Sequence, residues 1–150
     1  MQRNPAHCTA VGKAVLAYLS EGEVDTIIRQ HGMRRFTPST LTTPGDLKAE
    51  LRLIRERGYA IDNEENEEGV RCVAAVIRDY AGRPAAAISV SSPSFRLPLE
   101  KATSIAQLVC DTAQALSTEC GYRPAHGPDL HTAKPAASTA AANIESAGSK

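Results

Sequence analysis

Five acidic residues fall within seven consecutive positions of the segment GYAIDNEENEEGVRC, residues 58–72. They are Asp62, Glu64, Glu65, Glu67 and Glu68. Clustered carboxylates can bind calcium or perform acid–base chemistry when they converge on one point. A calcium loop of the EF-hand type needs alternating acids around a central glycine, whereas Gly69 stands at the end of this run. We therefore interpret the acids as a solvated turn, with Asp62 as the exception because it ends the preceding predicted strand.

Cys72 follows the acidic run and is a second residue type that can do chemistry. A cysteine nucleophile needs a base and a stabilised thiolate, and His7 is the one histidine expected near that end of the fold. The cysteines are Cys8, Cys72, Cys110 and Cys120. They contain no C-x-x-C pair, and no His or Cys pair has zinc spacing. We expect free thiols, no metal site and no cofactor.

Composition limits the class of protein. The chain has 150 residues with 42% hydrophobic and 23% charged residues, which is ordinary for one globular domain. Its net charge is zero, so no basic excess indicates nucleic-acid binding. The apolar runs are too short to cross a membrane and no leader opens the chain, so we expect a cytoplasmic protein. Residues 123–150 are rich in alanine and proline, which predicts a disordered tail after a domain of residues 1–122.

Periodicity predicts four helices, over residues 9–19, 20–32, 43–57 and 99–120. Thr9, a Ser20–Glu23 capping box and Thr43 supply the first three N-caps. The apolar side of the first helix is predicted to be Val11, Val15, Leu16 and Leu19. Strands are predicted over 59–62, 70–78 and 84–91, so the fold class is α+β with an antiparallel sheet.

A tight turn at Tyr80–Ala81 would pair Cys72 with Ser89 and Val70 with Ser91. One face of the sheet then carries a thiol and two hydroxyls among alanines, and the other face is apolar. This polar set indicates either a ligand pocket or small residues packed beneath a helix. Both interpretations remain open from spacing alone.

Four motifs resemble one protein family. They are H-x-T-A-x-G-K-A-x-L-A (7–17), L-x-x-I-R-x-R-G-Y-A-x-D-x-E-E (51–65), G-V-R-C-V-A-A (69–75) and A-A-I-S-V-S-S-P (86–93). In this order and spacing they resemble the effector-binding domain of IclR-family bacterial transcriptional regulators, over residues 5–122. The resemblance implies a GAF-like fold, a twisted antiparallel sheet flanked by helices with a small-molecule pocket on one face.

The resemblance also implies which residues bind the effector. They are Asp62, Cys72, Ser89 and Ser91, with the backbone near Ala10, Val11 and Gly12. The implied ligand is a small organic or aromatic acid, and DNA is reached through a winged helix-turn-helix that the matched region does not include. The family's Ser-Gly-Pro after the strand reads Ser91-Ser92-Pro93 here, so a different exit turn is expected.

Three functions follow for testing. The preferred one is a non-catalytic ligand sensor that forms homo-oligomers, since three short strands leave an open sheet edge. The second is a GAF-fold cysteine enzyme, such as a methionine sulfoxide reductase using Cys72. The third is an interaction module whose pocket no longer binds a ligand.

Overall fold

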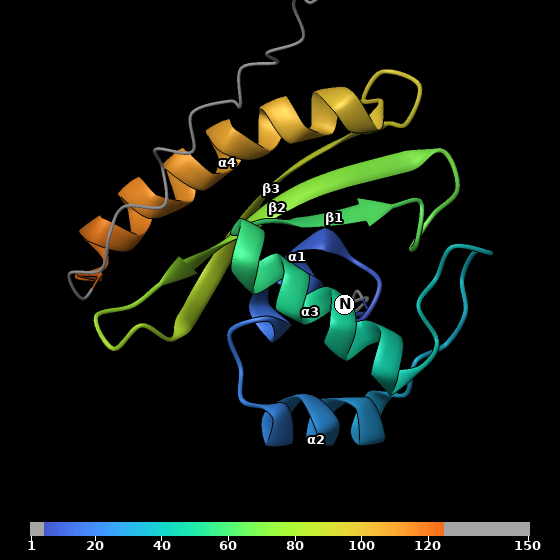
Figure 1. Ribbon diagram of the computed structural model, residues 1–150, viewed down its shortest axis with the longest axis horizontal. Helices are drawn as coiled ribbons and strands as arrows, with labels where there is room; N and C mark the ends of the chain where they lie inside the picture. The colour runs from blue at the N-terminus through green and yellow to red at the C-terminus, as the bar shows by residue number, and fades with distance from the viewer. Residues whose placement is uncertain (1–4, 125–150) are drawn as a thin grey trace, which may run out of the picture.

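The computed structural model describes residues 5–124, which form four helices and three strands (Figure 1). The helices are α1 (Ala10–Leu16), α2 (Glu21–His31), α3 (Pro44–Arg57) and α4 (Leu99–Glu119). The strands are β1 (Ala60–Asn63), β2 (Val70–Arg78) and β3 (Pro84–Pro93). The predicted α+β class is confirmed. From residue 125 onward the predicted tail lies outside the described residues.

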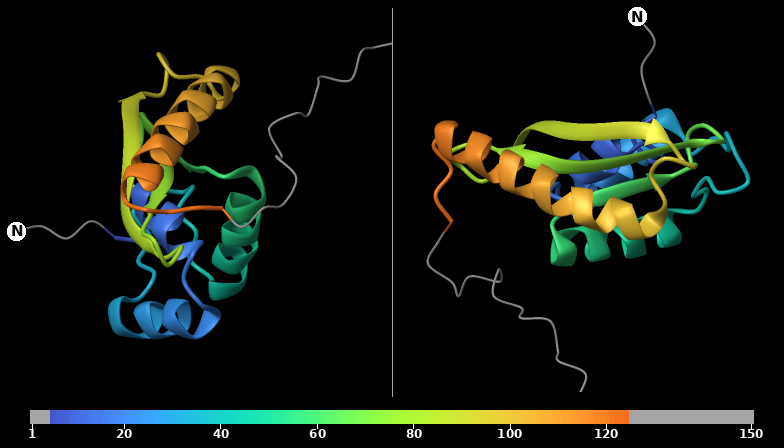
Figure 2. Two further views of the ribbon diagram at one scale, coloured as in Figure 1. Left: turned by 90° about the vertical axis from the view of Figure 1, so that its left-hand side faces the viewer. Right: turned by 90° about the horizontal axis from the view of Figure 1, so that it is seen from above.

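The strands form one antiparallel sheet in the order β1-β2-β3, with helices on both faces. In Figure 1, α4 runs above the sheet, and the other three helices lie below it. Alternate residues of β2 explain this division: Ala74 packs against residues of α1 and α3, whereas Val73 and Ala75 pack against α4. The left view of Figure 2 shows α2 at the bottom, apart from the sheet.

Side-chain caps begin the first three helices where the sequence predicts them. The Thr9 hydroxyl accepts the N–H of Gly12 at 3.2 Å. Ser20 and Glu23 form the full capping box of α2, and Thr43 caps α3. The first helix is shorter than predicted, since after Leu16 the chain continues in turns bonded to the third residue back.

The predicted apolar side of α1 is wrong in part. The structure buries Ala10, Lys13, Ala14 and Leu16. Val11 and Val15 are only partly buried, whereas Lys13 is 1% exposed. The apolar pattern does not predict the burial of this lysine, because that burial depends on an acidic partner far away in sequence. The ion pair lowers the cost of burying the charge.

The predicted pairing of β2 with β3 is displaced by two residues. Cys72 lies opposite Ser91 rather than Ser89, and Ala74 lies opposite Ser89. A shift of two keeps every side chain on its predicted face, because side chains alternate with a period of two. Cys72, Ser89 and Ser91 therefore still share one face of the sheet.

The displacement has two causes at the hairpin. Asp79 donates its N–H to the carbonyl of Arg83 at 2.9 Å, so the loop holds three residues instead of two. An irregularity between Ile77 and Arg78 adds a second residue of offset. Gly82 takes a positive φ of 76°, as the turn prediction expects.

Helix α4 places an apolar stripe on the sheet. Ala102, Ala106, Val109 and Ala113 are buried against β2, with Leu97 packed beside them. Leu116 is 40% exposed, whereas Ser117 is buried in the same turn. The Ser117 hydroxyl accepts the N–H of Arg78 at 3.0 Å, which fixes the end of α4 to the hairpin.

Candidate ligand-binding site

A polar cavity of about 260 Å³ lies where the start of α1 meets the sheet. Its lining residues are Thr9, Ala10, Val11, Asp62, Asn66, Glu67, Val70, Cys72, Ser89 and Ser91. Six of the seven residues that the sequence singled out are among them. The residues predicted from strand pairing and those implied by the family resemblance therefore lie at one place in the fold.

Strand pairing brings the polar side chains of this cavity into one row. Asp62 of β1 lies opposite Cys72 of β2, which lies opposite Ser91 of β3. The Cys72 sulfur is 3.0 Å from the Ser91 hydroxyl oxygen. Ser89 stands one pair further along, opposite the buried Ala74. The row therefore needs all three strands, and the small Ala74 leaves room beside it.

The carboxylate of Asp62 organises the loop that follows β1. Its Oδ1 accepts the N–H of Glu65 at 2.8 Å and that of Asn66 at 3.4 Å. Burial raises the pKa of Asp62, and these backbone bonds and the charge of Lys13 act in the opposite direction. Asp62 is 3% exposed. It lines the cavity, and its hydrogen bonds also shape the loop.

The interpretation of the acidic run as a wholly solvated turn is wrong for Glu65. This residue is 7% exposed, and its carboxylate is paired with Lys13. Its main-chain carbonyl accepts the hydroxyl of Thr40 at 2.6 Å, which anchors the loop further. Glu67 and Glu68 are exposed, as predicted. The sequence did not indicate this buried acid, because the predicted apolar side of the first helix did not include Lys13.

Gly12 is the one predicted site residue that does not line the cavity. Its N–H is already donated to Thr9. A Cβ atom at this position would lie 2.4 Å from the Cα and from the carbonyl oxygen of Ala6. The glycine therefore serves close packing of the segment before α1, rather than contact with the cavity.

The geometry does not fit a cysteine nucleophile. Burial raises the pKa of Cys72, an effect that the hydrogen bond with Ser91 only partly offsets, so the thiol form is favoured at neutral pH. The Nε2 atom of His7 is bonded to the carbonyl of Arg34 at 2.9 Å, and His7 lines a different cavity. Within residues 5–124 no three His, Cys, Asp or Glu side chains are grouped to hold a metal ion.

Fold and cavity together define a domain of the kind that bacterial transcription regulators use to bind effectors. The family model "Bacterial transcriptional regulator IclR C-terminal" matches residues 2–118. The chain belongs to this family, as its C-terminal, effector-binding domain. The resemblance drawn from the four motifs is confirmed.

Similar proteins agree with this assignment. The HTH-type transcriptional repressor AllR of Escherichia coli is 43% identical over 121 residues, which cover 81% of this chain and 45% of AllR. The C-terminal domain of the E. coli regulator KdgR superposes with a TM-score of 0.75 at 36% identity, covering 81% of this chain and 74% of that one.

A third similar structure is a complex with a small aromatic acid. A double mutant of the inducer-binding domain of PobR from Acinetobacter, in complex with 3-hydroxybenzoic acid, gives a TM-score of 0.71 at 29% identity. The match covers 75% of this chain and 65% of that one.

These relatives are transcription regulators and not enzymes, which confirms the expectation of a non-catalytic domain. The chain spans less than half the length of AllR. Among the described residues, no helix combines the length and the apolar character needed to cross a membrane.

Proposed function

We propose that the chain is the sensor of a transcription regulator. Its polar cavity binds a small organic acid, and occupancy changes the activity of a winged helix-turn-helix elsewhere in the regulator, through which DNA is bound. The observation that carries this proposal is the row formed by Asp62, Cys72 and Ser91 across three strands, in the wall of one cavity. The similarity to AllR, a transcriptional repressor, supports the regulatory role. The similarity to the PobR domain in complex with 3-hydroxybenzoic acid supports binding of a small acid.

The lining chemistry favours a hydroxy or oxo acid over a simple carboxylate. Asp62 and Glu67 are acceptors that suit a ligand hydroxyl, and the lining set contains no lysine or arginine. Ser89, Ser91 and the first N–H groups of α1, at Ala10 and Val11, can donate to a carboxylate or carbonyl oxygen. At about 260 Å³ the cavity is smaller than those that hold drug-sized ligands, so the acid is small.

Asp62 offers a route by which occupancy alters the protein. The same carboxylate that faces the cavity holds the turn at Glu65 and Asn66. A ligand hydroxyl that bonds to Asp62 therefore competes with, or strengthens, the bonds that shape this loop. A ligand shifts a conformational equilibrium only by its differential affinity for two states. The proposal therefore requires that the loop after β1 has a second arrangement when the ligand is bound.

Calorimetric titration of the full chain with lactate, pyruvate and 3-hydroxybenzoate tests the proposal. Ser89→Ala should weaken binding of the recognised acid by about 2- to 10-fold, because it removes one hydrogen bond made by an exposed serine. Ser92→Ala is the matched control: Ser92 lies on the same strand, pairs with Arg71 and points to the opposite face. Equal affinities of both variants would remove Ser89 from the site. If none of the acids binds, the result favours the third function, an interaction module whose pocket no longer binds a ligand.

A further inference from the structure

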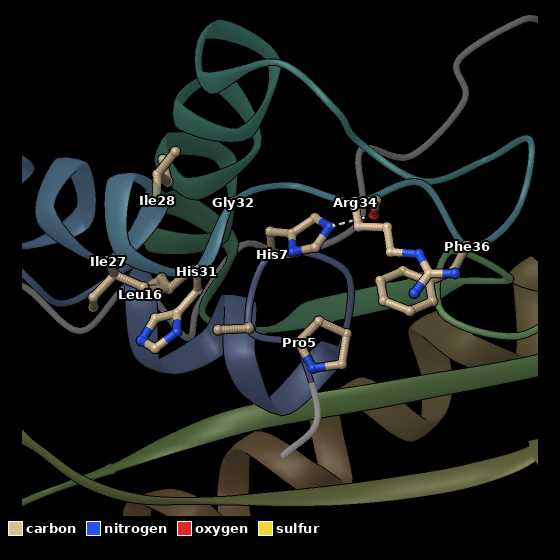
Figure 3. A pocket seen from close by; sticks show the side chains of 10 residues that line it. Pro5, His7, Leu16, Ile27, Ile28, His31, Gly32, Arg34 and Phe36 are labelled. Carbon is tan, nitrogen blue, oxygen red and sulfur yellow. Dashed lines mark hydrogen bonds between the residues drawn. The ribbon is translucent and has the colours of Figure 1, made fainter. Parts of the chain in front are cut away.

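A second cavity, of about 480 Å³, lies beside the segment that precedes α1 (Figure 3). It is enclosed by α1, α2 and the chain segments 5–7 and 32–36. No residue lines both this cavity and the polar one. The two are therefore separate spaces, and we refer to the second as the apolar cavity.

Most of the wall of the apolar cavity is hydrophobic. Leu16 of α1 and Ile27 and Ile28 of α2 form one side, and Pro5 and Phe36 form the other. Its volume falls in the range of cavities that hold small organic ligands, which are typically apolar with a few polar groups. The wall thus suits a ring or a branched aliphatic group.

The polar groups of this cavity carry positive charge or are neutral. Arg34 and His31 are exposed at its rim, and no aspartate or glutamate is among the lining residues. The Arg34 guanidinium stands 5.5 Å from the centre of the Phe36 ring, so a cation and an aromatic face are held together. This is the reverse of the polar cavity, whose lining includes Asp62 and Glu67 without a lysine or arginine.

His7 adds a buried polar group at the centre of the wall. It is 6% exposed, and its Nε2 is bonded to the carbonyl of Arg34. A carbonyl can only accept, so Nε2 is the donor of this bond and Nδ1 is left without a partner in it. In Figure 3 this second nitrogen lies on the side of the ring that faces Pro5 and His31. A ligand bound in the apolar cavity should therefore change the magnetic environment of the His7 ring.

We propose that the apolar cavity is a second ligand site, which takes a monocarboxylate with an aromatic or branched aliphatic body. The carboxylate meets the guanidinium of Arg34 at the rim, and the apolar body lies against Leu16, Ile27 and Ile28. Charge complementarity selects the anion, because the rim offers the guanidinium of Arg34 and the lining residues include no aspartate or glutamate. The site is independent of the sensor function proposed for the polar cavity.

Titration of the full chain with 3-phenylpropionate tests this site, with 3-phenylpropan-1-ol as the uncharged analogue. Arg34→Gln should weaken binding of the acid about fivefold and leave binding of the alcohol unchanged, as expected for one exposed ion pair. Arg35→Gln is the matched control: it removes the same charge from the next residue, which is also exposed but does not line the cavity. The ring resonances of His7 should shift on addition of the acid.

Three results would overturn the proposal. They are the absence of saturable binding up to the solubility limit of the acid, equal affinities of the two arginine variants, and loss of binding in Ser89→Ala. The last result would place the probe in the polar cavity. The two proposals fail separately, since Ser89→Ala should weaken binding of the small hydroxy or oxo acid and leave the affinity for 3-phenylpropionate unchanged.

Discussion

The ammonium group of Lys13 meets the carboxylate of Glu65 in the interior of the protein, although 52 positions separate them in sequence. Their side chains are 1% and 9% exposed. Lys13 also donates to the carbonyl of Ile61 at 2.7 Å. The pair joins α1 to the acidic loop, and both elements supply residues to the wall of the polar cavity. It therefore fixes the separation of the two sides of that cavity.

Removing the charge of Lys13 should strongly destabilise the protein. Lys13→Met leaves Glu65 buried without its partner, and such a loss typically costs about 3–5 kcal/mol. Glu65 already has one buried oxygen, Oε2, with no hydrogen-bond partner among the described residues. Urea unfolding followed by circular dichroism measures the change in free energy.

A surface pair in the same region supplies the control. Lys48 is bonded to Asp25 at 2.8 Å, but both side chains are partly exposed, so Lys48→Met should cost less than about 1 kcal/mol. The double variant Lys13→Met with Glu65→Leu should recover part of the loss, since no buried charge is left unpaired. Similar losses for Lys13→Met and Lys48→Met would show that the interior pair is not special.

A methyl group at Gly12 should disturb the segment that precedes α1. The added Cβ would lie 2.4 Å from backbone atoms of Ala6, so the chain must move or α1 must shift. We expect Gly12→Ala to lower stability by about 1–3 kcal/mol, the usual cost of overpacking. Gly22→Ala is the matched control, because nothing lies within 4 Å of a Cβ there. In a helix this change should add about 0.5–1 kcal/mol. Equal effects in thermal unfolding would contradict the packing role of Gly12.

Local signals in the sequence were sufficient for most of the fold. The caps at Thr9, Ser20 and Thr43 depend on side chains that bond to backbone within three residues, so reading them needs no tertiary information. The faces of β2 and β3 were also predictable, because side chains alternate along a strand. Cys72 and Ser91 stay on one face of the sheet for any register that differs by an even number of residues. That is why the polar cavity could be anticipated.

Structural features that depend on contacts between distant segments could not be predicted from the sequence. The burial of Lys13 needs Glu65, and nothing local in either segment requires the pair. The register of β3 needed the three-residue loop and the irregularity near Arg78, neither of which composition reveals. The apolar cavity escaped notice for the same reason, since Ile28 and Phe36 read as ordinary packing residues until the fold brings them beside His7.

Burial should make the cysteines differ widely in reactivity. Desolvation raises the pKa of Cys8 from 9.0 to about 12, with Asp62 and Glu65 adding to the effect. At about pH 8 its thiolate fraction is then roughly a thousandfold below that of an unperturbed thiol. Iodoacetamide labelling read by mass spectrometry should modify the exposed Cys120 first and Cys8 last. Rapid alkylation of Cys72 would contradict the raised pKa assigned to it.

The same pKa shift predicts a loss of stability in alkaline solution. Because the folded pKa of Cys8 exceeds its unfolded value, the unfolded chain releases this proton first as the pH rises. The free energy of unfolding should therefore fall between pH 9.0 and about 12, and it is unaffected by this thiol below that window. Cys8→Ala should flatten the slope. Cys120→Ala, at an exposed position, is the control.

The outer edge of β3 should support association of the chain with itself. Strand β3 ends the sheet order, and within residues 5–124 no other strand pairs with its outer edge. Val90 on this strand is 39% exposed, and Leu108 on α4 is 67% exposed. An unpaired strand edge beside exposed apolar side chains favours pairing with a second copy. We therefore expect light scattering of the full chain to detect an oligomer whose population rises with concentration.

A charge at the edge tests this mechanism. Val90→Lys should shift the equilibrium toward the monomer, because a lysine on an edge strand opposes pairing by desolvation and by repulsion between copies. Gln30→Lys adds the same charge at an exposed position of α2, away from the sheet, and should leave association unchanged. If both variants associate as the parent chain does, β3 is not the contact. A chain that stays monomeric at high concentration would show that the edge is protected without a partner.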